Sequence, residues 1–365
     1  MEKVRIAIIG TGQIGKHHLE EYTKIKDAEI VAVCNRSIEK AEEVANIYNV
    51  PHVYSDYKKM IERDDIDAID VCLHNALHAL VTIDVLNSGK NVYCEKPIAD
   101  SYKNGLAMLE AARRNNCMLH IQLGHIYRPY ARAVKRLIDG GALGEIYHAR
   151  SMGLRRRFRP YVDGYGSMQF VQKEISGGGA LLDVGVYKIA LMLYLLGRPG
   201  IERISGNTYQ KTGMDELRRE KSGYNVEEMA TGYIRFENNV SLDLFEAWAA
   251  HMDDIGPSSI LGTKGGVKFG VDTFSYHTTY CDLELNCTGD LNAMEYRWNN
   301  TQENEDAYTS SQAHWVAALQ KRVPLLPTAE IALDTMLIEE GIYLSASLGR
   351  EVTSDEVKAF SEGKL

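Results

Sequence analysis

The sequence predicts an α/β chain with a doubly wound parallel sheet in its N-terminal part and an α+β domain rich in strands after it. Short β-branched runs, such as residues 6–9, 29–34 and 67–73, alternate with segments whose apolar residues recur at helical spacing. This alternation implies parallel strands joined by helical crossovers. Beyond residue 125, strand-like runs follow one another with turn residues such as Asn238-Asn239 between them, which is typical of antiparallel sheet.

The first predicted strand runs directly into the pattern Gly-x-Gly-x-x-Gly at residues 10–15. Gly10 permits a tight turn, Gly12 lets the backbone approach a pyrophosphate, and Gly15 allows close packing of helix on strand. The helix that follows supplies amide donors and positive potential at its N-terminus. A glycine-rich turn without a ligand is the alternative, but the strand before the loop and the helix after it favour a dinucleotide site. Its expected cofactor contacts are Gly10, Gly12, Gln13, Ile14 and Gly15.

The end of the second strand bears on the choice of cofactor. An Asp or Glu there normally binds the ribose hydroxyls, but this chain has Asn35-Arg36. Asn35 can still hydrogen-bond a ribose, and Arg36 can pair with a 2′-phosphate or stack on adenine. The sequence therefore predicts NAD or NADP, either exchanged at each turnover or tightly bound.

The remaining elements continue the same alternation. We expect N-terminal helices over 38–48, 57–63 and 79–87 and one ending at 115, with strands near 52–54, from 91 and over 118–123. In the second domain we expect strands over 145–154, 201–209, 229–236, 240–248, 258–262 and 265–269, and late helices over 312–320 and 329–347. We place a dinucleotide-binding Rossmann domain at 1–125. A substrate-binding and oligomerisation domain follows at 126–365, and its C-terminal helices can pack back on the first domain.

Composition excludes several classes of partner. A net charge of −9 argues against a nucleic-acid or anionic-membrane surface. The six cysteines show no Cys-x-x-Cys spacing, so we expect reduced thiols and no metal site. The first strand begins almost at Met1 and no run of about 20 apolar residues stands out, so we expect neither a signal peptide nor a membrane span, and a cytoplasmic protein.

Four motifs in order carry a resemblance to a known family: the glycine loop, Asn75-x-x-His78, Glu95-Lys96-Pro97, and Gly177-Gly178-Gly179-Ala180-Leu181-Leu182-Asp183-Val184-Gly185. The chain resembles the Gfo/Idh/MocA oxidoreductases, which include glucose–fructose oxidoreductase and inositol dehydrogenase. The resemblance implies a Rossmann domain, an open and mostly antiparallel sheet domain, and a substrate between them. It also implies cofactor contacts from Asn75, His78 and Glu95, a Lys96 that faces the nicotinamide and the reacting hydroxyl, and a homodimer or higher homo-oligomer.

The chemistry of Lys96 agrees with that role. A lysine directly before a proline is extended or in a turn, and here it follows a strand at the edge where the sheet opens. Its ammonium can hydrogen-bond the reacting oxygen and stabilise developing alkoxide charge. An exposed loop lysine paired with Glu95 is the alternative.

The second motif departs from the family pattern Asp-x-Gly-x-His-x-x-Asp. Asp183 is kept, Tyr187 replaces the His and Ala190 replaces the second Asp. Asp183 and Tyr187 are four residues apart on a helix, so both can reach one hydroxyl. A tyrosine pKa of about 10 is high for a base, and a neighbouring Lys96 ammonium would lower it. Relatives with Tyr at this position support the pairing, and Tyr187 as a core residue is the alternative.

Candidate substrate contacts come from Tyr127, Arg128, Arg156 and Tyr165. The basic run that contains Arg156 can also be a solvated loop or a subunit contact. Residues 214–228 are charged, and we expect a surface insert there. His314 is expected to pack beside Trp315 rather than to reach the site.

The sequence therefore predicts an NAD(P)-dependent dehydrogenase that transfers hydride between nicotinamide and a secondary alcohol of a sugar, glycoside or cyclitol. Lys96 polarises the oxygen, Tyr187 takes the proton and Asp183 binds a neighbouring hydroxyl. One narrower form oxidises a glycoside ring to a keto-glycoside. Two other hypotheses remain open at this point: a redox-neutral glycosidase that uses bound NAD, and a non-catalytic dinucleotide sensor. The sensor is disfavoured because it gives the three polar residues no reason to occur together.

Overall fold

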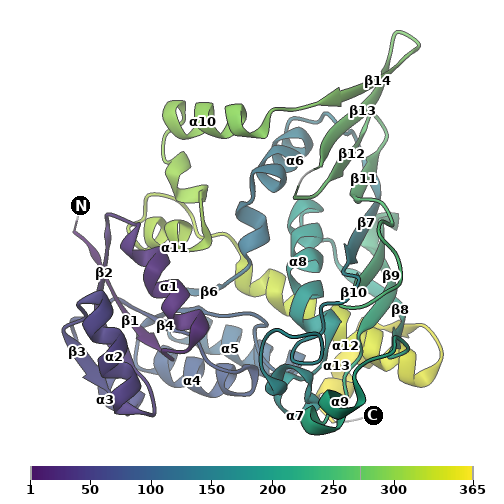
Figure 1. The fold of residues 1–365 in the computed structure, drawn as a ribbon. Coiled ribbons are helices and arrows are strands. Elements are labelled where there is room, and N and C mark those ends of the chain that lie inside the picture. The colour runs from purple at the N-terminus through teal and green to yellow at the C-terminus, as the bar shows by residue number, and fades with distance from the viewer. Residues whose placement is uncertain (1, 272, 364–365) are drawn as a thin grey trace. The chain divides into compact units, whose positions relative to one another are not determined.

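The computed structural model describes residues 2–271 and 273–363. The chain forms two compact units (Figure 1). Unit 1 runs up to Asp100 and also takes in Asn104–Gln122 and Asn299–Glu330. Unit 2 consists of Ser101–Lys103, Leu123–Trp298 and the chain from Ile331 onward. A segment from the C-terminal third of the sequence is therefore part of the N-terminal unit.

Unit 1 contains the predicted parallel sheet. Its six strands lie in the order β3-β2-β1-β4-β5-β6, and every neighbouring pair is parallel. The order reverses between β1 and β4, the position at which doubly wound sheets bind their ligands. The strands are β1 Val4–Ile9, β2 Ala28–Cys34, β3 His52–Tyr54, β4 Ala68–Val71, β5 Asn91–Cys94 and β6 Leu119–Ile121.

The connecting helices follow the predicted pattern closely. They are α1 Gln13–Thr23, α2 Ile38–Tyr48, α3 Tyr57–Ile61, α4 Asn75–Asn87 and α5 Tyr102–Arg114. The late segment adds the short helix η5 Glu305–Tyr308 and α11 Ser311–Leu319. Trp315 of α11 is fully buried in the same core cluster as Ile6 and Ile8 of β1. This burial explains why the late segment belongs to unit 1.

Unit 2 is organised on a nine-stranded sheet in the order β14-β13-β12-β11-β7-β10-β9-β8-β15. Among the described strands of this sheet, only β7 and β10 pair in parallel, and the other pairs are antiparallel. The strands are β7 Ile146–Leu154, β8 Ile201–Tyr209, β9 Met229–Phe236, β10 Ser241–Ala247, β11 Ser258–Gly262, β12 Gly266–Phe269, β13 Phe274–Tyr280, β14 Leu283–Thr288 and β15 Val352–Thr353. The prediction of a second, mostly antiparallel sheet is confirmed.

The remaining helices belong wholly or mainly to unit 2, and some of them pack against its sheet. They are η1 Gly124–Tyr127, α6 Pro129–Asp139, η2 Met168–Val171, α7 Lys173–Ser176, η3 Leu181–Gly185, α8 Val186–Leu195, α9 Glu216–Ser222, η4 Glu237–Asn239, α10 Leu291–Thr301, α12 Thr328–Leu348 and α13 Ser354–Ser361. A side chain at Gly206 or Gly232 would collide with Ile342 of α12, so these two strand positions let the helix lie close to the sheet.

Two segments differ from the sequence expectation. Residues 214–228 are not a surface insert throughout, because they form α9 and then turn inward, where Tyr224, Val226 and Glu228 are buried. The hairpin β13–β14 and helix α10 were not predicted. Every residue of β14 is exposed, so this strand lacks the alternation of buried and exposed positions by which strands are recognised.

One helical stretch, Lys173–Leu195, is long and apolar enough to cross a membrane by length and composition. In its most apolar window, 72% of the residues are buried inside the protein. We interpret the stretch as the core helix of unit 2, since buried helices of globular proteins are apolar all round.

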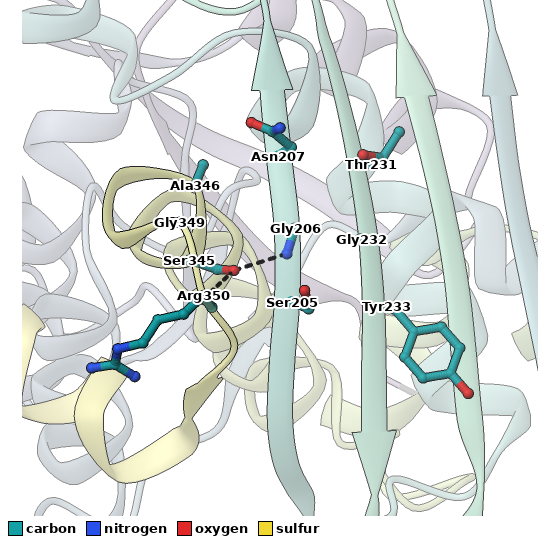
Figure 2. A pocket seen from close by; sticks show the side chains of 10 residues that line it. All are labelled: Ser205, Gly206, Asn207, Thr231, Gly232, Tyr233, Ser345, Ala346, Gly349 and Arg350. Atoms are coloured by element: carbon teal, nitrogen blue, oxygen red, sulfur yellow. Dashed lines mark hydrogen bonds between the residues drawn. The ribbon is translucent and has the colours of Figure 1, made fainter.

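A shallow cavity of about 450 Å³ lies where the end of α12 meets β8 and β9 (Figure 2). Ser345 donates a hydrogen bond to the carbonyl of Arg350 and accepts one from the amide of Gly206. None of the site residues predicted from the sequence is among the described residues of its lining. This cavity is therefore separate from the residues of the predicted site.

Candidate functional site

The glycine loop between β1 and α1 has the close packing that its pattern predicts. Gly10 has a φ of +99°, and a side chain there would collide with the carbonyl of Cys72 at the end of β4. A side chain at Gly15 would collide with the carbonyl of Gly10, so α1 lies against the strand end. Gly12, Gln13 and Ile14 are exposed at the N-terminus of α1. The backbone amides of this turn are thus available to an anionic ligand.

The end of β2 is tied to this loop through Asn35. The Asn35 side-chain amide donates to Thr11 Oγ1 at 2.7 Å, and Asn35 Oδ1 accepts from the Ser37 amide at 3.0 Å. Arg36 is exposed beside it. Asn35 therefore holds the loop in place, and Arg36 is the residue at this strand end whose charge a ligand can reach.

A buried chain of hydrogen bonds leads from α1 to Lys96. His18 Nδ1 lies 2.8 Å from Asp70 Oδ2, and His18 Nε2 lies 2.7 Å from Glu95 Oε1. The other Glu95 oxygen accepts the Lys96 backbone amide at 2.9 Å. His18 and Asp70 are fully buried. The chain fixes the backbone of Lys96 at the carboxyl end of β5, followed by a cis peptide bond to Pro97.

The hydrogen-bonded residues His18, Asp70 and Glu95 form an ion-pair network. Burial by itself lowers the pKa of His18, but the Asp70 carboxylate and Cys72 outweigh it and raise that pKa well above its ordinary value. Burial likewise raises the pKa of Glu95, but the hydrogen bond and charge of His18 outweigh it and lower that pKa. Donor atoms of His18, Asp70 and Cys72 lie within 4.8 Å of one another, as metal ligands can. The 2.7 and 2.8 Å separations of ring nitrogens from carboxylate oxygens are hydrogen-bond distances, so we interpret the group as an ion-pair network.

Two of the expected cofactor contacts, His78 and Glu95, have hydrogen-bond partners within the protein. His78 is fully buried, and its ring nitrogens lie 2.8 Å from the Pro97 carbonyl oxygen and 3.0 Å from that of Leu73. Its ring thus joins the loops that follow β4 and β5. The Glu95 carboxylate is likewise engaged by His18 and by the Lys96 amide. Asn75 is the first residue of α4, at the carboxyl end of β4, where the motif places it.

In unit 2 the second motif forms a π-helical turn, Leu181–Gly185, that continues into α8. Such turns are rare and occur frequently at functional sites. Asp183 and Tyr187 are both half-buried, whereas Ile189 and Ala190 are buried, so the two predicted residues share the accessible face of the segment.

Two residues that the sequence did not single out hold this pair. The Trp248 indole donates from Nε1 to Asp183 Oδ2 at 3.1 Å, and Trp248 itself is fully buried. The His125 ring stacks on the Tyr187 ring, with 5.0 Å between centroids and 24° between planes. Both contacts join residues far apart in the chain, so no local pattern could have revealed them.

Lys188 lies next to Tyr187 but binds elsewhere. Its ammonium donates to the Met152 carbonyl at 2.6 Å and lies 3.9 Å from Glu246 Oε2. Lys188 and His125 both line a cavity of about 330 Å³ within unit 2. This volume is within the range of small-molecule pockets. The space beside the His125–Tyr187 stack is therefore large enough for a ring-sized ligand.

Glu246 should make the stability of the protein depend on pH. Burial raises the pKa of this fully buried carboxyl from 4.5 to about 7, although Lys188 and Ser151 act in the opposite direction. The unfolded chain releases this proton at lower pH than the folded chain does. Stability is therefore lost as pH rises from about 4.5 to about 7, by an amount on the order of 3 kcal/mol.

The variant Glu246→Gln removes the titration and keeps the shape of the side chain. We expect its free energy of unfolding to decline less than that of the wild type between pH 5 and pH 8, by about 3 kcal/mol, in urea titrations at both pH values. Differences that stay constant across this pH range would contradict the assignment.

The candidate substrate residues are dispersed over unit 2. Arg128 and Arg156 are exposed, Tyr127 is buried, and Tyr165 stacks on Phe158 with 3.9 Å between centroids. The residue of the basic run that organises this loop is Arg159, which was not predicted as a site residue. Arg159 is fully buried and donates to Asp163, to Glu228 and to the carbonyls of Thr212 and Gly213. It holds the loop that displays Arg156 and Tyr165.

Comparison with known proteins identifies relatives along the whole chain. The chain is 28% identical to D-glucoside 3-dehydrogenase of Escherichia coli strain K12 over 356 residues, 96% of this chain and 97% of that protein. It is 32% identical to the scyllo-inositol 2-dehydrogenase (NADP(+)) IolU of Bacillus subtilis strain 168 over 213 residues, 56% of this chain and 61% of that protein. The crystallised levoglucosan dehydrogenase in complex with NADH and levoglucosan has the same fold, with a TM-score of 0.79 and 21% identity over 97% of this chain and all of that one.

Two family models match the chain in order. The model of the oxidoreductase family with an NAD-binding Rossmann fold covers residues 4–123. The model of the GFO/IDH/MocA C-terminal domain covers residues 131–268. The first contains the glycine loop and Lys96, and the second contains Asp183 and Tyr187. The chain therefore belongs to the GFO/IDH/MocA family of oxidoreductases.

Proposed function

We propose that this protein is an NAD(P)-dependent dehydrogenase that transfers hydride between nicotinamide and a secondary alcohol of a sugar, glycoside or cyclitol. The observation that carries the proposal is the buried chain from His18 through Glu95 to the Lys96 backbone. It holds a lysine at the carboxyl end of β5, on the same sheet edge as the glycine loop after β1. A dinucleotide bound at that edge would supply the hydride acceptor.

Each predicted side chain then has one role. Lys96 orients the reacting hydroxyl and stabilises negative charge on its oxygen as the C–H bond breaks. Tyr187 accepts the hydroxyl proton, and Asp183, oriented by Trp248, binds a neighbouring hydroxyl. Gly10, Gly12, Gln13, Ile14, Gly15, Asn35, Arg36 and Asn75 form or border the dinucleotide site.

The relatives support a carbohydrate substrate. The match to D-glucoside 3-dehydrogenase runs over nearly the full length of both proteins, and we infer that a glycoside ring oxidised to a keto-glycoside is the narrower form of the reaction. The cavity of about 330 Å³ beside His125 fits a second ring or an aglycone. No relative named above is a glycosidase or a dinucleotide sensor.

The test begins with the purified protein. Denaturation followed by chromatography identifies any dinucleotide that is carried through purification. A separate sample of the native enzyme is then assayed with sugars, glycosides and cyclitols, in the presence of NAD or of NADP. The reaction is followed at the nicotinamide absorbance band. Net reduction of the cofactor with one of these alcohols is expected. Substrate consumption with cleavage of the glycosidic bond and no net change in cofactor would favour the redox-neutral glycosidase.

Arg36 should decide how well NADP binds. In the variant Arg36→Ala, we expect the KM for NADP to rise about tenfold and the KM for NAD to change less than twofold, since only NADP offers a 2′-phosphate to the guanidinium. Steady-state kinetics with each cofactor measures this. An equal rise for both cofactors would show that Arg36 stacks on adenine instead.

We also propose a homodimer or higher homo-oligomer. Tyr233 and Leu261 are large, exposed side chains on the same face of the unit 2 sheet, as the register through Asp243, Arg150 and His148 requires. A contiguous apolar patch on a broad sheet face would mark a contact surface, and these two side chains would contribute to one. Light scattering of the purified protein would give its mass in solution, and a monomer would contradict this proposal.

A further inference from the structure

Three consecutive backbone amides at the start of the motif segment all bind one distant residue, Glu227. Both Glu227 carboxylate oxygens lie 2.9 Å from the Gly179 amide nitrogen, and Oε1 also accepts the Leu181 amide at 3.0 Å. The amide between them, on Ala180, donates to the Glu227 backbone carbonyl at 3.2 Å. One residue just before β9 therefore fixes the entry to the segment that carries Asp183 and Tyr187.

The glycines of the motif make room for this arrangement. A side chain at Gly179 would collide with the Glu227 carbonyl oxygen. A side chain at Gly178 would collide with the Tyr343 hydroxyl of α12. That hydroxyl donates to Glu227 Oε1 at 2.9 Å. Gly178 and Gly179 thus leave the space that Glu227 and Tyr343 occupy. We call these two residues, which together hold the start of the segment, the clamp.

The clamp substitutes for a helix cap. The residue at the N-cap position of the π-helical turn Leu181–Gly185 is Ala180, whose methyl side chain cannot accept a capping hydrogen bond. The first backbone bond of the segment runs from the Asp183 amide to the Gly179 carbonyl at 3.0 Å. Gly179 is itself held by Glu227, so a shift of the clamp moves Asp183, and through the continuous helix it moves Tyr187.

The next residue along the chain holds Asp183 by a second route. The Glu228 carbonyl accepts the Trp248 backbone amide at 2.8 Å, and the Trp248 indole binds Asp183. The Glu228 side chain points the other way and binds Arg159 at 2.8 Å. Adjacent residues of this extended segment thus serve opposite faces.

We propose that Glu227 is a positioning residue of the catalytic segment, oriented by Tyr343, and that the two together set the placement of Asp183 and Tyr187. The inference rests on the proposed function, because it assumes that these two side chains act on the substrate. Glu227 touches neither substrate nor cofactor in this role. Misplacement of reacting groups by about 1 Å is enough to lower a rate substantially.

The hydrogen bonds that Glu227 accepts offset part of the cost of burying its carboxyl group. Burial raises the pKa of this carboxyl, while the hydrogen bonds from Leu181, Tyr343 and Gly179 act in the opposite direction. In Glu227→Gln one acceptor oxygen becomes an NH₂ group that faces an amide donor. In Tyr343→Phe only the orienting hydroxyl is lost, and the aromatic ring stays. Glu227→Gln is therefore the strong perturbation of the clamp, and Tyr343→Phe is the mild one.

The experiment compares Tyr343→Phe with a matched control. Tyr57→Phe removes a similar bond, from the Tyr57 hydroxyl to Asp84 at 2.7 Å, on α3 of unit 1. For Tyr343→Phe we expect kcat to fall about tenfold, while the dissociation constant for dinucleotide stays within twofold, measured by fluorescence. For Tyr57→Phe we expect kcat within twofold of the wild type. Glu227→Gln should lower kcat further if it folds.

A second readout does not depend on activity. Hydrogen exchange should show faster exchange of the amides of residues 179–187 in Tyr343→Phe than in the wild type and the control. Suppose that Tyr343→Phe and Tyr57→Phe lower the melting temperature by the same amount, and that Tyr343→Phe keeps its kcat and its amide protection. The clamp is then only structural, and the proposal is overturned. If the wild type oxidises no sugar, glycoside or cyclitol, the proposed function fails separately. Faster exchange at 179–187 alone would then still support the placement of the segment by Glu227 and Tyr343.

Discussion

Replacing Lys96 with methionine should lower kcat by about three orders of magnitude and leave dinucleotide binding within twofold of the wild type. In the proposed mechanism the Lys96 ammonium stabilises charge on the reacting oxygen, and a methionine side chain of similar length cannot do so. The hydrogen bond to the Glu95 carboxylate comes from the Lys96 backbone amide, so the loop after β5 keeps its position in the variant. Single-turnover measurements at saturating alcohol would isolate the chemical step.

Lys59→Met is a suitable control for that experiment. Lys59 is exposed on α3, and its loss removes the same charge from unit 1 without touching β5 or its loop. We expect its kcat to match that of the wild type. A Lys96→Met enzyme with unchanged kcat would show that the lysine is a surface residue that takes no part in the reaction.

Replacing Tyr187 with phenylalanine should lower kcat by about two to three orders of magnitude. The variant keeps a ring that can stack on His125 at the same 5.0 Å, so the packing of the segment is preserved and only the hydroxyl is lost. A phenol has an ordinary pKa of about 10 and acts as a base only after losing its proton. We therefore expect kcat of the wild type to rise with pH.

The pH profile separates a base from a binding group. Tyr187→Phe should lose the rise of kcat with pH as well as the rate itself. Tyr194→Phe, on the same helix, is the control, because its ring can remain over the Lys135 ammonium at 5.8 Å. Unchanged turnover and unchanged pH dependence in Tyr187→Phe would contradict its role as proton acceptor. A rise in KM alone would make it a substrate-binding residue.

Local patterns in the sequence predicted most of the framework. Strands 201–209, 229–236 and 258–262 occur with the bounds that alternation and turn residues indicate, because both signals act over a few residues. The glycine loop was predictable for the same reason. Gly10 and Gly15 are required by contacts within one strand–turn–helix unit and with the neighbouring strand. Lys96, Asp183 and Tyr187 could be proposed as site residues because they lie inside contiguous motifs.

Only the tertiary structure decided which groups hold those residues. His18 and Glu95 are 77 positions apart, Asp183 and Trp248 are 65 apart, and Gly179 and Glu227 are 48 apart. By sequence, the charges of 214–228 indicated a solvated insert, since isolated buried charge is costly. Glu227 and Glu228 are buried nevertheless, because backbone amides, Tyr343 and Arg159 bind them there. The sequence thus determined most of the secondary structure and the candidate chemical groups of the site. The long-range hydrogen bonds that allow their charges to be buried exist only once the chain is folded.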